Sequence, residues 1–252
     1  MSTFLELAQE TRALSGVGGT GPTDVPTATG IEGRIVNYLK NAWIDIQMHP
    51  KKWKWMWGRY LAPAPGGSPL QTIADTREYP LTGVDRVRVN SFRSYLTTTG
   101  VSDRQKMIWL SWRKFDQAHG TVDELANRPI CVTRDPSGQL VLYPKANDIY
   151  SIEFEYFKTA QILAVNGDIP EMPTDFHQLI VYEALKRFGK AEDAPEIIKL
   201  GEEAAGSEGS EGRPVSGLWR SLIWSQEYKD ADTDDESDFL TVRAGHEDYG
   251  DY

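Results

Sequence analysis

The chain has 252 residues, which is long enough for one large domain or two smaller ones, each with a real hydrophobic core. About 40% of the residues are apolar and 25% are charged, and this globular composition excludes a chain that is disordered throughout. The net charge of -10 disfavours a protein that binds DNA of any sequence, because such binding uses Lys and Arg to displace counterions.

The negative charge is concentrated near the C-terminus. The segment from Lys229 to Tyr252 contains 9 acidic and 2 basic residues, so the rest of the chain carries a net charge of only about -3. The first residues, MSTFLELAQETRALSG, lack the basic and apolar regions of a signal peptide, and no apolar run approaches the length of a membrane span. We therefore expect a protein of a reducing, cytoplasm-like compartment that does not insert into a membrane.

The N-terminal region predicts a capped helix and then a loop. Thr3 is a suitable N-cap with Glu6 as its capping-box partner, and Ser15-Gly16 ends the helix. Residues 16–30 are rich in Gly and Thr, which predicts a loop. Its GVGGTG sequence lacks both the preceding strand and the final Gly-Lys-Ser/Thr of a phosphate-binding loop. A flexible connector is the better interpretation.

A second helix is predicted from Gly30 to His49, and Pro50 ends it. Its apolar residues recur at steps of three and four, with Trp43 beside the stripe that they form: Ile31, Ile35, Tyr38, Leu39, Ala42 and Ile46. The next residues, KKWKWMWGRY, place Trp53, Trp55 and Trp57 at every second position. Two interpretations stay open for them. They form a strand with one packed Trp-rich face, or an aromatic platform for single-stranded nucleic acid or sugar.

From Tyr60 to Thr159 the sequence predicts an antiparallel meander of short strands, curled into a small sandwich or barrel. Asp135-Pro136-Ser137-Gly138 predicts a hairpin loop, and residues 144–148 join the next pair of strands. A short helix is expected at Leu110–His119 with Ser111 as its cap. The predicted strands are Leu70–Ile73, Arg86–Phe92, Met107–Trp109, Ile130–Thr133, Leu140–Tyr143 and Tyr150–Phe157.

After the last of these strands the chain predicts a return to helices. A helix from Thr174 to Lys190 should pack against the helix from Gly30 to His49. A further helix follows with Pro195 at its first position, and residues 206–214 predict a flexible break. An amphipathic segment at Val215–Glu227 comes before the acidic tail.

The tail contains DADTDDESD from Asp230 to Asp238, which invites comparison with a calcium-binding loop. The comparison fails, because Asp235 stands where Gly is required and Thr241 where a bidentate Glu is required. A solvated acidic extension is the simpler interpretation. The alternative is a tail that docks on a partner, with Phe239 to Val242 as its anchors.

No residue pattern predicts an enzyme, a metal site or a cofactor. The single Cys131 excludes an internal disulfide, and His49, His119, His177 and His246 lie in unrelated contexts. The sequence contains no G-x-S-x-G motif that could anchor a nucleophilic serine. We therefore expect no catalytic activity and no cofactor.

The order of these parts resembles bacteriophage head-to-tail adaptor proteins, which are also called connector or head-completion proteins. The resemblance covers most of residues 3–190, and its segments are FLELAQETRALSGVGGTGP, IVNYLKNAWIDIQ, KKWKWMW, LSWRKFDQAHG, RPICVTRDPSGQLVLYPKANDIYSIEFEYFKTAQIL and IPEMPTDFHQLIVYEAL. Residues beyond about 205 match less well, so the role of the tail is not implied by the resemblance.

The resemblance implies a structural virion protein without enzyme activity, made in the host cytoplasm. Such adaptors form a ring, commonly of twelve subunits, beneath the portal. They extend the DNA channel and offer a docking surface to tail or nozzle proteins, and DNA passes without sequence-specific binding. The implied fold class is α+β, a helical bundle with an inserted antiparallel β-rich domain. The expected parts are the N-terminal helices of the bundle (1–50), the β-rich domain (51–165), the C-terminal helices (166–205) and a flexible extension (206–252).

Surplus aromatic residues suit the interfaces of such a ring, since rings need two different contact faces on each subunit. The expected subunit or portal contacts are Trp43, Trp53, Trp55, Trp57, Trp219, Trp224, Phe239 and Leu240. The alternative function is a carbohydrate- or receptor-binding β module that uses the three Trp residues between positions 53 and 57. An enzyme with an unrecognised site is the less favoured second alternative.

Overall fold

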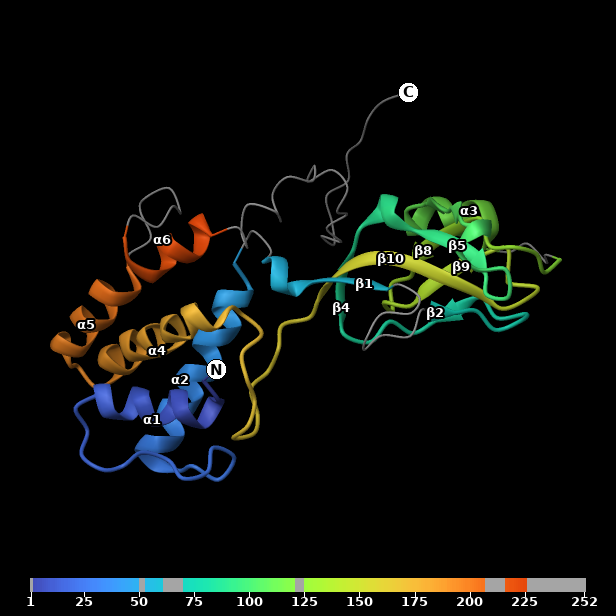
Figure 1. The fold of residues 1–252 in the computed structure, drawn as a ribbon. Coiled ribbons are helices and arrows are strands. Elements are labelled where there is room, and N and C mark those ends of the chain that lie inside the picture. The colour runs from blue at the N-terminus through green and yellow to red at the C-terminus, as the bar shows by residue number, and fades with distance from the viewer. Residues whose placement is uncertain (1, 50–52, 61–69, 121–124, 207–215, 226–252) are drawn as a thin grey trace. The chain divides into compact units, whose positions relative to one another are not determined.

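The fold is α+β, and the computed structural model describes residues 2–49, 53–60, 70–120, 125–206 and 216–225 (Figure 1). This part of the chain contains six α-helices: α1 (Phe4–Leu14), α2 (Gly30–Gln47), α3 (Trp112–His119), α4 (His177–Ala191), α5 (Pro195–Ala205) and α6 (Gly217–Trp224). It forms two compact units. The helical unit contains the described residues up to Met56 and from Ala160 onward, and the β unit contains those from Trp57 to Thr159.

Helix α4 is central to the helical unit, because it contacts α1, α2 and α5. The predicted packing of α4 against α2 is therefore confirmed. Their shared core is apolar and fully buried, and it includes Ile35, Leu39, Trp43, Ile46, Leu179, Ile180, Ala184 and Leu185. Helix α5 approaches α4 closely at Gly201, where an added Cβ would lie 2.6 Å from Cγ of Lys186 and 2.9 Å from the carbonyl oxygen of Tyr182.

The predicted helix starts agree with the structure where local side chains control them. Thr3 and Glu6 form the expected capping box, and Pro195 begins α5. The helix expected to begin at Thr174 instead opens with a 3-10 turn, and its α-helical part begins at His177. Ser111 does precede α3, although its side chain makes no capping hydrogen bond.

The β unit contains two sheets within its described residues. The first has the order β1-β10-β5-β6, with β2 and β4 also paired to β10, and the second has the order β3-β9-β8-β7. The strands are β1 (Trp57–Tyr60), β2 (Leu70–Gln71), β3 (Glu78–Tyr79), β4 (Val84–Val87), β5 (Arg93–Leu96), β6 (Gln105–Lys106), β7 (Ile108–Trp109), β8 (Cys131–Arg134), β9 (Leu140–Tyr143) and β10 (Tyr150–Lys158).

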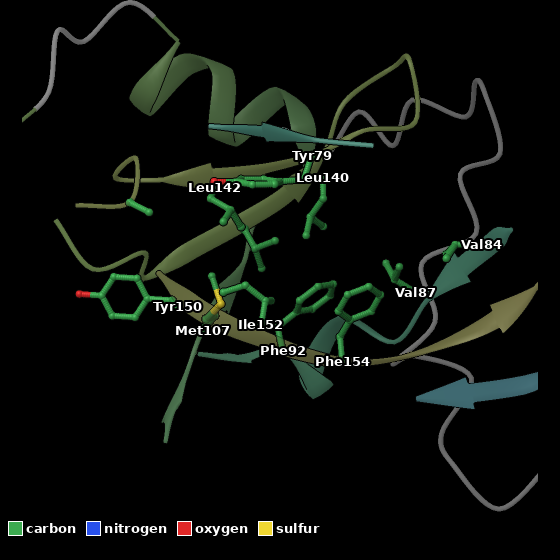
Figure 2. Close-up of a cluster of buried hydrophobic side chains, with 12 residues drawn as sticks. Tyr79, Val84, Val87, Phe92, Met107, Leu140, Leu142, Tyr150, Ile152 and Phe154 are labelled. Carbon is green, nitrogen blue, oxygen red and sulfur yellow. The ribbon is translucent and has the colours of Figure 1, made fainter. Parts of the chain in front are cut away.

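Side chains from both sheets meet in one hydrophobic core. Figure 2 shows this cluster, in which Ile152 and Phe154 of the first sheet, and Phe92 directly before β5, lie near Leu140 and Leu142 of the second sheet. Phe92 and Phe154 stack with their ring centroids 4.8 Å apart. Packing between two sheets explains why the inner positions of these short strands are apolar.

The meander prediction is wrong in its connections. The 135–138 hairpin is confirmed, since β8 and β9 pair antiparallel across it. However, β9 and β10 belong to different sheets and do not pair, and β7 pairs with β8 in parallel. Strand β10 instead pairs with β1, β2, β4 and β5, because its nine residues are long enough to span several short partners.

The single strand expected at Arg86–Phe92 is also wrong. Strand β4 ends at Val87, and a 3-10 turn at Val89–Ser91 separates it from β5. At this break the hydroxyl of Ser91 accepts a hydrogen bond from the backbone N–H of Glu155 at 2.9 Å. This side-chain contact replaces a ladder bond on the neighbouring β10.

Candidate functional site

No metal-binding cluster occurs among the residues that the structure describes. They include no group of three or more His, Cys, Asp or Glu side chains that could hold a metal ion. His119 stacks on Tyr143 with 3.6 Å between ring centroids. His177 is buried, which lowers the pKa of its imidazole, and it hydrogen-bonds the carbonyl oxygen of Met172 at 3.1 Å. His246 lies outside the described residues.

An aromatic cluster in the helical unit is the most prominent grouping of the predicted site residues. The rings of Trp53 and Trp55 stack nearly parallel, with centroids 4.8 Å apart. His49 lies 5.3 Å from Trp53 and 6.0 Å from Trp219. We call these four residues the aromatic cluster. Aromatic pairs at such separations contribute more than the area that they bury.

The fold of residues 53–56 explains how the aromatic cluster forms. The indole N–H of Trp53 donates to the carbonyl oxygen of Ile46 at 2.6 Å, so the ring is held against the last turn of α2. The backbone N–H of Met56 then donates to the carbonyl of Trp53 at 3.1 Å, which closes a 3-10 turn at Lys54–Met56. The predicted strand with a single Trp face is therefore wrong, because β1 begins only at Trp57.

Helix α6 reaches the aromatic cluster through Trp219. Its indole N–H donates to a carboxylate oxygen of Glu183 on α4 at 2.5 Å, and the ammonium of Lys186 lies 2.5 Å from the same oxygen. Leu222, one turn later, is fully buried. A charge-assisted hydrogen bond and two apolar anchors thus attach α6 to the helical unit.

A pocket of about 600 Å³ lies beside this contact. Its charged side chains compensate one another, since Arg187 pairs with Asp45 and Lys186 pairs with Glu183. The pocket therefore offers a mixture of charged and apolar surface. It is lined by Ala42, Asp45, Ile46, Met48, His49, Glu183, Lys186, Arg187, Lys190, Glu202, Gly206 and Trp219.

The remaining predicted contact residues that the structure describes differ in exposure. Trp43 is fully buried in the core between helices, whereas Trp224 at the end of α6 is 65% exposed. Trp57 is half-buried at the start of β1. Phe239 and Leu240 lie outside the described residues.

The aromatic platform for sugar or single-stranded nucleic acid, the alternative interpretation of Trp53, Trp55 and Trp57, is not formed by these three side chains together. Such a platform needs ring faces that are open to a ligand. Trp53 is fully buried and one of its faces is stacked on Trp55. The alternating Trp residues therefore have different environments.

Two residues of this region were not predicted from the sequence. Glu183 anchors Trp219 although 36 positions separate them, and no local pattern marks that carboxylate as a partner. The sequence marks His49 only as a candidate metal ligand or catalytic group, whereas the structure places it beside two Trp rings. The one sequence signal for its location was its position directly before Pro50, at the predicted end of a helix.

Comparison with known protein families identifies a phage adaptor family. The family model for the SU10 adaptor protein matches residues 2–213. The comparison with curated proteins gives no match. Within the described residues, no helix combines the length and the apolar character that crossing a membrane requires.

Proposed function

The chain belongs to the SU10 adaptor protein family, a family of phage head-to-tail adaptors, and we propose that it assembles into a ring that docks on the portal. In this role it extends the DNA channel and provides the attachment site for tail or nozzle proteins. It is a structural component of the virion at the head-to-tail interface. The observation that carries the proposal is the family match, which covers every described helix and strand except α6.

We assign the helical unit to a bundle and the β unit to an inserted domain. The chain leaves the helical unit after Met56 and returns to it at Ala160, which supports an insertion. In the ring, residues 1–50 and 166–205 supply the bundle and 51–165 the inserted domain. Residues 206–252 form an extension, in which α6 is a packed helix.

The proposed ring needs two different contact faces on each subunit, because a heterologous interface closes by rotation. Of the proposed contact residues that the structure describes, Trp224 is the most exposed, and Trp55 and Trp57 are half-buried. Trp43, Trp53 and Trp219 are buried and would act by shaping that surface from within. Phe239 and Leu240 are proposed to contact the portal or a neighbouring subunit.

DNA must pass the ring without being held, so the channel wall should not carry a cationic surplus. The described residues of the helical unit include 14 Asp or Glu and 9 Lys or Arg. This balance supports a channel wall that repels phosphate and reads no sequence. Twelve copies are proposed, in line with the ring size that is common among such adaptors.

Imaging of the protein on virions tests this function most directly. Negative-stain images of virions labelled on this chain should place it at the vertex that carries the tail, and purified chain mixed with portal particles should add a ring to them. A chain that neither binds portal particles nor co-purifies with virions would refute the adaptor role.

A matched pair of variants tests the proposed contact surface. Trp224→Ala should weaken assembly on the portal, because the variant removes a large exposed ring. Val101→Ala, which truncates an apolar side chain that is 63% exposed in the β unit, serves as the control. Equal assembly of the two variants would remove Trp224 from the interface.

A further inference from the structure

Charge is divided unequally between the two units. The described residues of the β unit include 13 Lys or Arg and 9 Asp or Glu, so the described part of this unit is cationic although the whole chain has a net charge of -10. The helical unit has the opposite balance. The β unit is therefore the part of the described chain to which a polyanion would be attracted.

Much of this positive charge lies on one face of the first sheet. Ile152 and Phe154 of β10 point into the core, so Glu153 and Glu155 lie on the opposite face. Register places Arg59 of β1 beside Glu155.

The same face continues across the two next strands. Arg93 of β5 stands beside Glu153, and Lys106 of β6 stands beside Arg93. Residues that are directly opposite on paired strands share a face. These positions therefore form two rows of charged side chains.

Two further arginines join this face through ion pairs. Arg88 lies 3.0 Å from a carboxylate oxygen of Glu155, and Arg104 lies 2.6 Å from one of Glu153. We define the basic face as five cations around two carboxylates, namely Arg59, Arg88, Arg93, Arg104, Lys106, Glu153 and Glu155. It carries a surplus of three positive charges.

The two carboxylates form the base of this face and position the arginines. The side chains of Glu153 and Glu155 are 5% and 16% exposed, whereas that of Arg59 is 49% exposed. A guanidinium has five N–H donors in a fixed plane, so a contact with one carboxylate leaves donors that can bind another. The basic face is therefore prepared to bind further carboxylates.

We propose that the basic face binds the acidic C-terminal segment of the same chain, centred on Asp230 to Asp238. Charge complementarity supports this occupant, because residues 226–252 include 10 acidic and 2 basic side chains. The helical unit repels such a segment through its own acidic surplus. Docking of the segment neutralises the basic face, so the β unit does not hold DNA while the genome passes.

The chain length permits this contact. A segment of 27 residues, from 226 to 252, can extend to about 90 Å, at roughly 3.3 Å for each residue. This exceeds the width of a unit of about 100 residues, whose radius of gyration is about 13 Å. The segment is therefore long enough to extend across a whole unit of this size. The proposal does not depend on ring assembly, since both partners belong to one chain.

Zero-length cross-linking of carboxylates to lysines in the full-length chain tests the contact. Lys106 lies on the basic face, while Lys114 on α3 and Lys199 on α5 are comparison lysines elsewhere. Mass spectrometry of the monomer should find links from residues 230–238 to Lys106 about tenfold more often than to either comparison lysine, because docking raises the local concentration of carboxylates. The links should be lost at about 0.5 M NaCl, where exposed charges are screened.

A matched pair of variants keeps the test specific. Arg59→Gln should reduce the Lys106 links about twofold to fivefold, as expected for one exposed ion pair, and Glu155 keeps its contact with Arg88. Arg113→Gln on α3 makes the same charge change away from the basic face and should leave the links unchanged.

Three outcomes would overturn the proposal. Links spread evenly over the three lysines would show a solvated tail, and links found only in cross-linked dimers would show a different occupant. The third outcome combines two results. The tail forms no cross-links, and the triple variant Asp230→Asn/Asp232→Asn/Asp234→Asn binds duplex DNA as well as the unmodified protein does. The basic face would then be open to phosphate regardless of the tail.

Discussion

Replacing Trp219 by Ala should release helix α6 from the helical unit without unfolding the rest of it. Trp219 is buried and donates a hydrogen bond to Glu183, so its loss removes about 3–5 kcal/mol of packing and polar contact. The remaining fully buried anchor, Leu222, contributes only about 1.5–3 kcal/mol. Helix α6 has 8 residues, and isolated helices shorter than about 12 residues are marginal in water. The docked helix should therefore become unstable in this variant.

Hydrogen exchange measured by mass spectrometry gives a direct readout of this release. In Trp219→Ala protein the amides of α6 should exchange at the rate of an unfolded peptide, while those of α2 and α4 keep their protection. Trp224→Ala is the matched control, since it removes the same side chain from the same helix at a position that is 65% exposed. This control should change stability by less than about 0.5 kcal/mol.

Trp219→Phe separates the two contributions to the anchor. It keeps an aromatic ring in the buried position and removes the hydrogen bond to Glu183, so it should give partial release of α6. If the amides of α6 stay protected in Trp219→Ala protein, or if Trp219→Ala and Trp224→Ala behave alike, then Trp219 does not anchor the helix and the reasoning is refuted.

Three further changes test the packing of the helical unit. Gly201→Ala should lower the free energy of unfolding by about 1 kcal/mol in thermal denaturation. Overpacking against Tyr182 costs about 1–3 kcal/mol, and the better helix propensity of Ala offsets about 1 kcal/mol of that cost. Gly167→Ala is the control and should have no comparable effect, because nothing lies within 4 Å of its added Cβ. Thr3→Ala should cost about 1 kcal/mol by removing the capping box, and an unchanged urea midpoint would contradict this. Burial lowers the pKa of His177 below 6.5, so the imidazole takes up a proton in the unfolded chain before it does so in the folded chain as the pH falls. The free energy of unfolding should therefore be complete above pH 6.5 and fall by at most about 1.4 kcal/mol for each pH unit below it. Urea titrations at pH 7.5 and 5 should show that His177→Gln reduces this loss.

The predictable parts of this fold are those that short stretches of sequence control. The apolar period of α2 and the contact between Thr3 and Glu6 involve residues a few positions apart, so the sequence contains the whole interaction. The 135–138 hairpin is similar, because Asp135 and Gly138 close the turn with a 3.0 Å hydrogen bond between their backbone groups.

The unpredicted parts depend on contacts between distant residues. The alternation of Trp53, Trp55 and Trp57 has the period of a strand, but the hydrogen bond from Trp53 to Ile46 turns the chain instead. The parallel pairing of β7 with β8 joins Ile108 to Cys131, and no pattern within either strand specifies that partner.

The division of charge between the two units also depends on contacts between distant residues. The acidic tail is visible in the sequence because its residues are contiguous, whereas the helical unit is assembled from two separated parts of the chain. A count of charged residues along the sequence therefore mixes the acidic surplus of the helical unit with the positive charge of the β unit, which lies between its two segments. The opposite charges of the two units become visible only when residues are grouped by contact.

The burial of the Trp residues narrows the choice of surfaces that partners can use. Trp43 and Trp53 have no exposed surface, so a binding partner cannot reach them while the helical unit is folded. In the β unit the exposed apolar residues include the β-branched Ile108 and Ile130, which are joined by a 2.8 Å backbone hydrogen bond and are 59% and 50% exposed. Exposed apolar neighbours lose water on association, whereas buried rings contribute only to folding. Mutations that separate binding from folding should therefore be sought at such aliphatic pairs before the buried Trp residues.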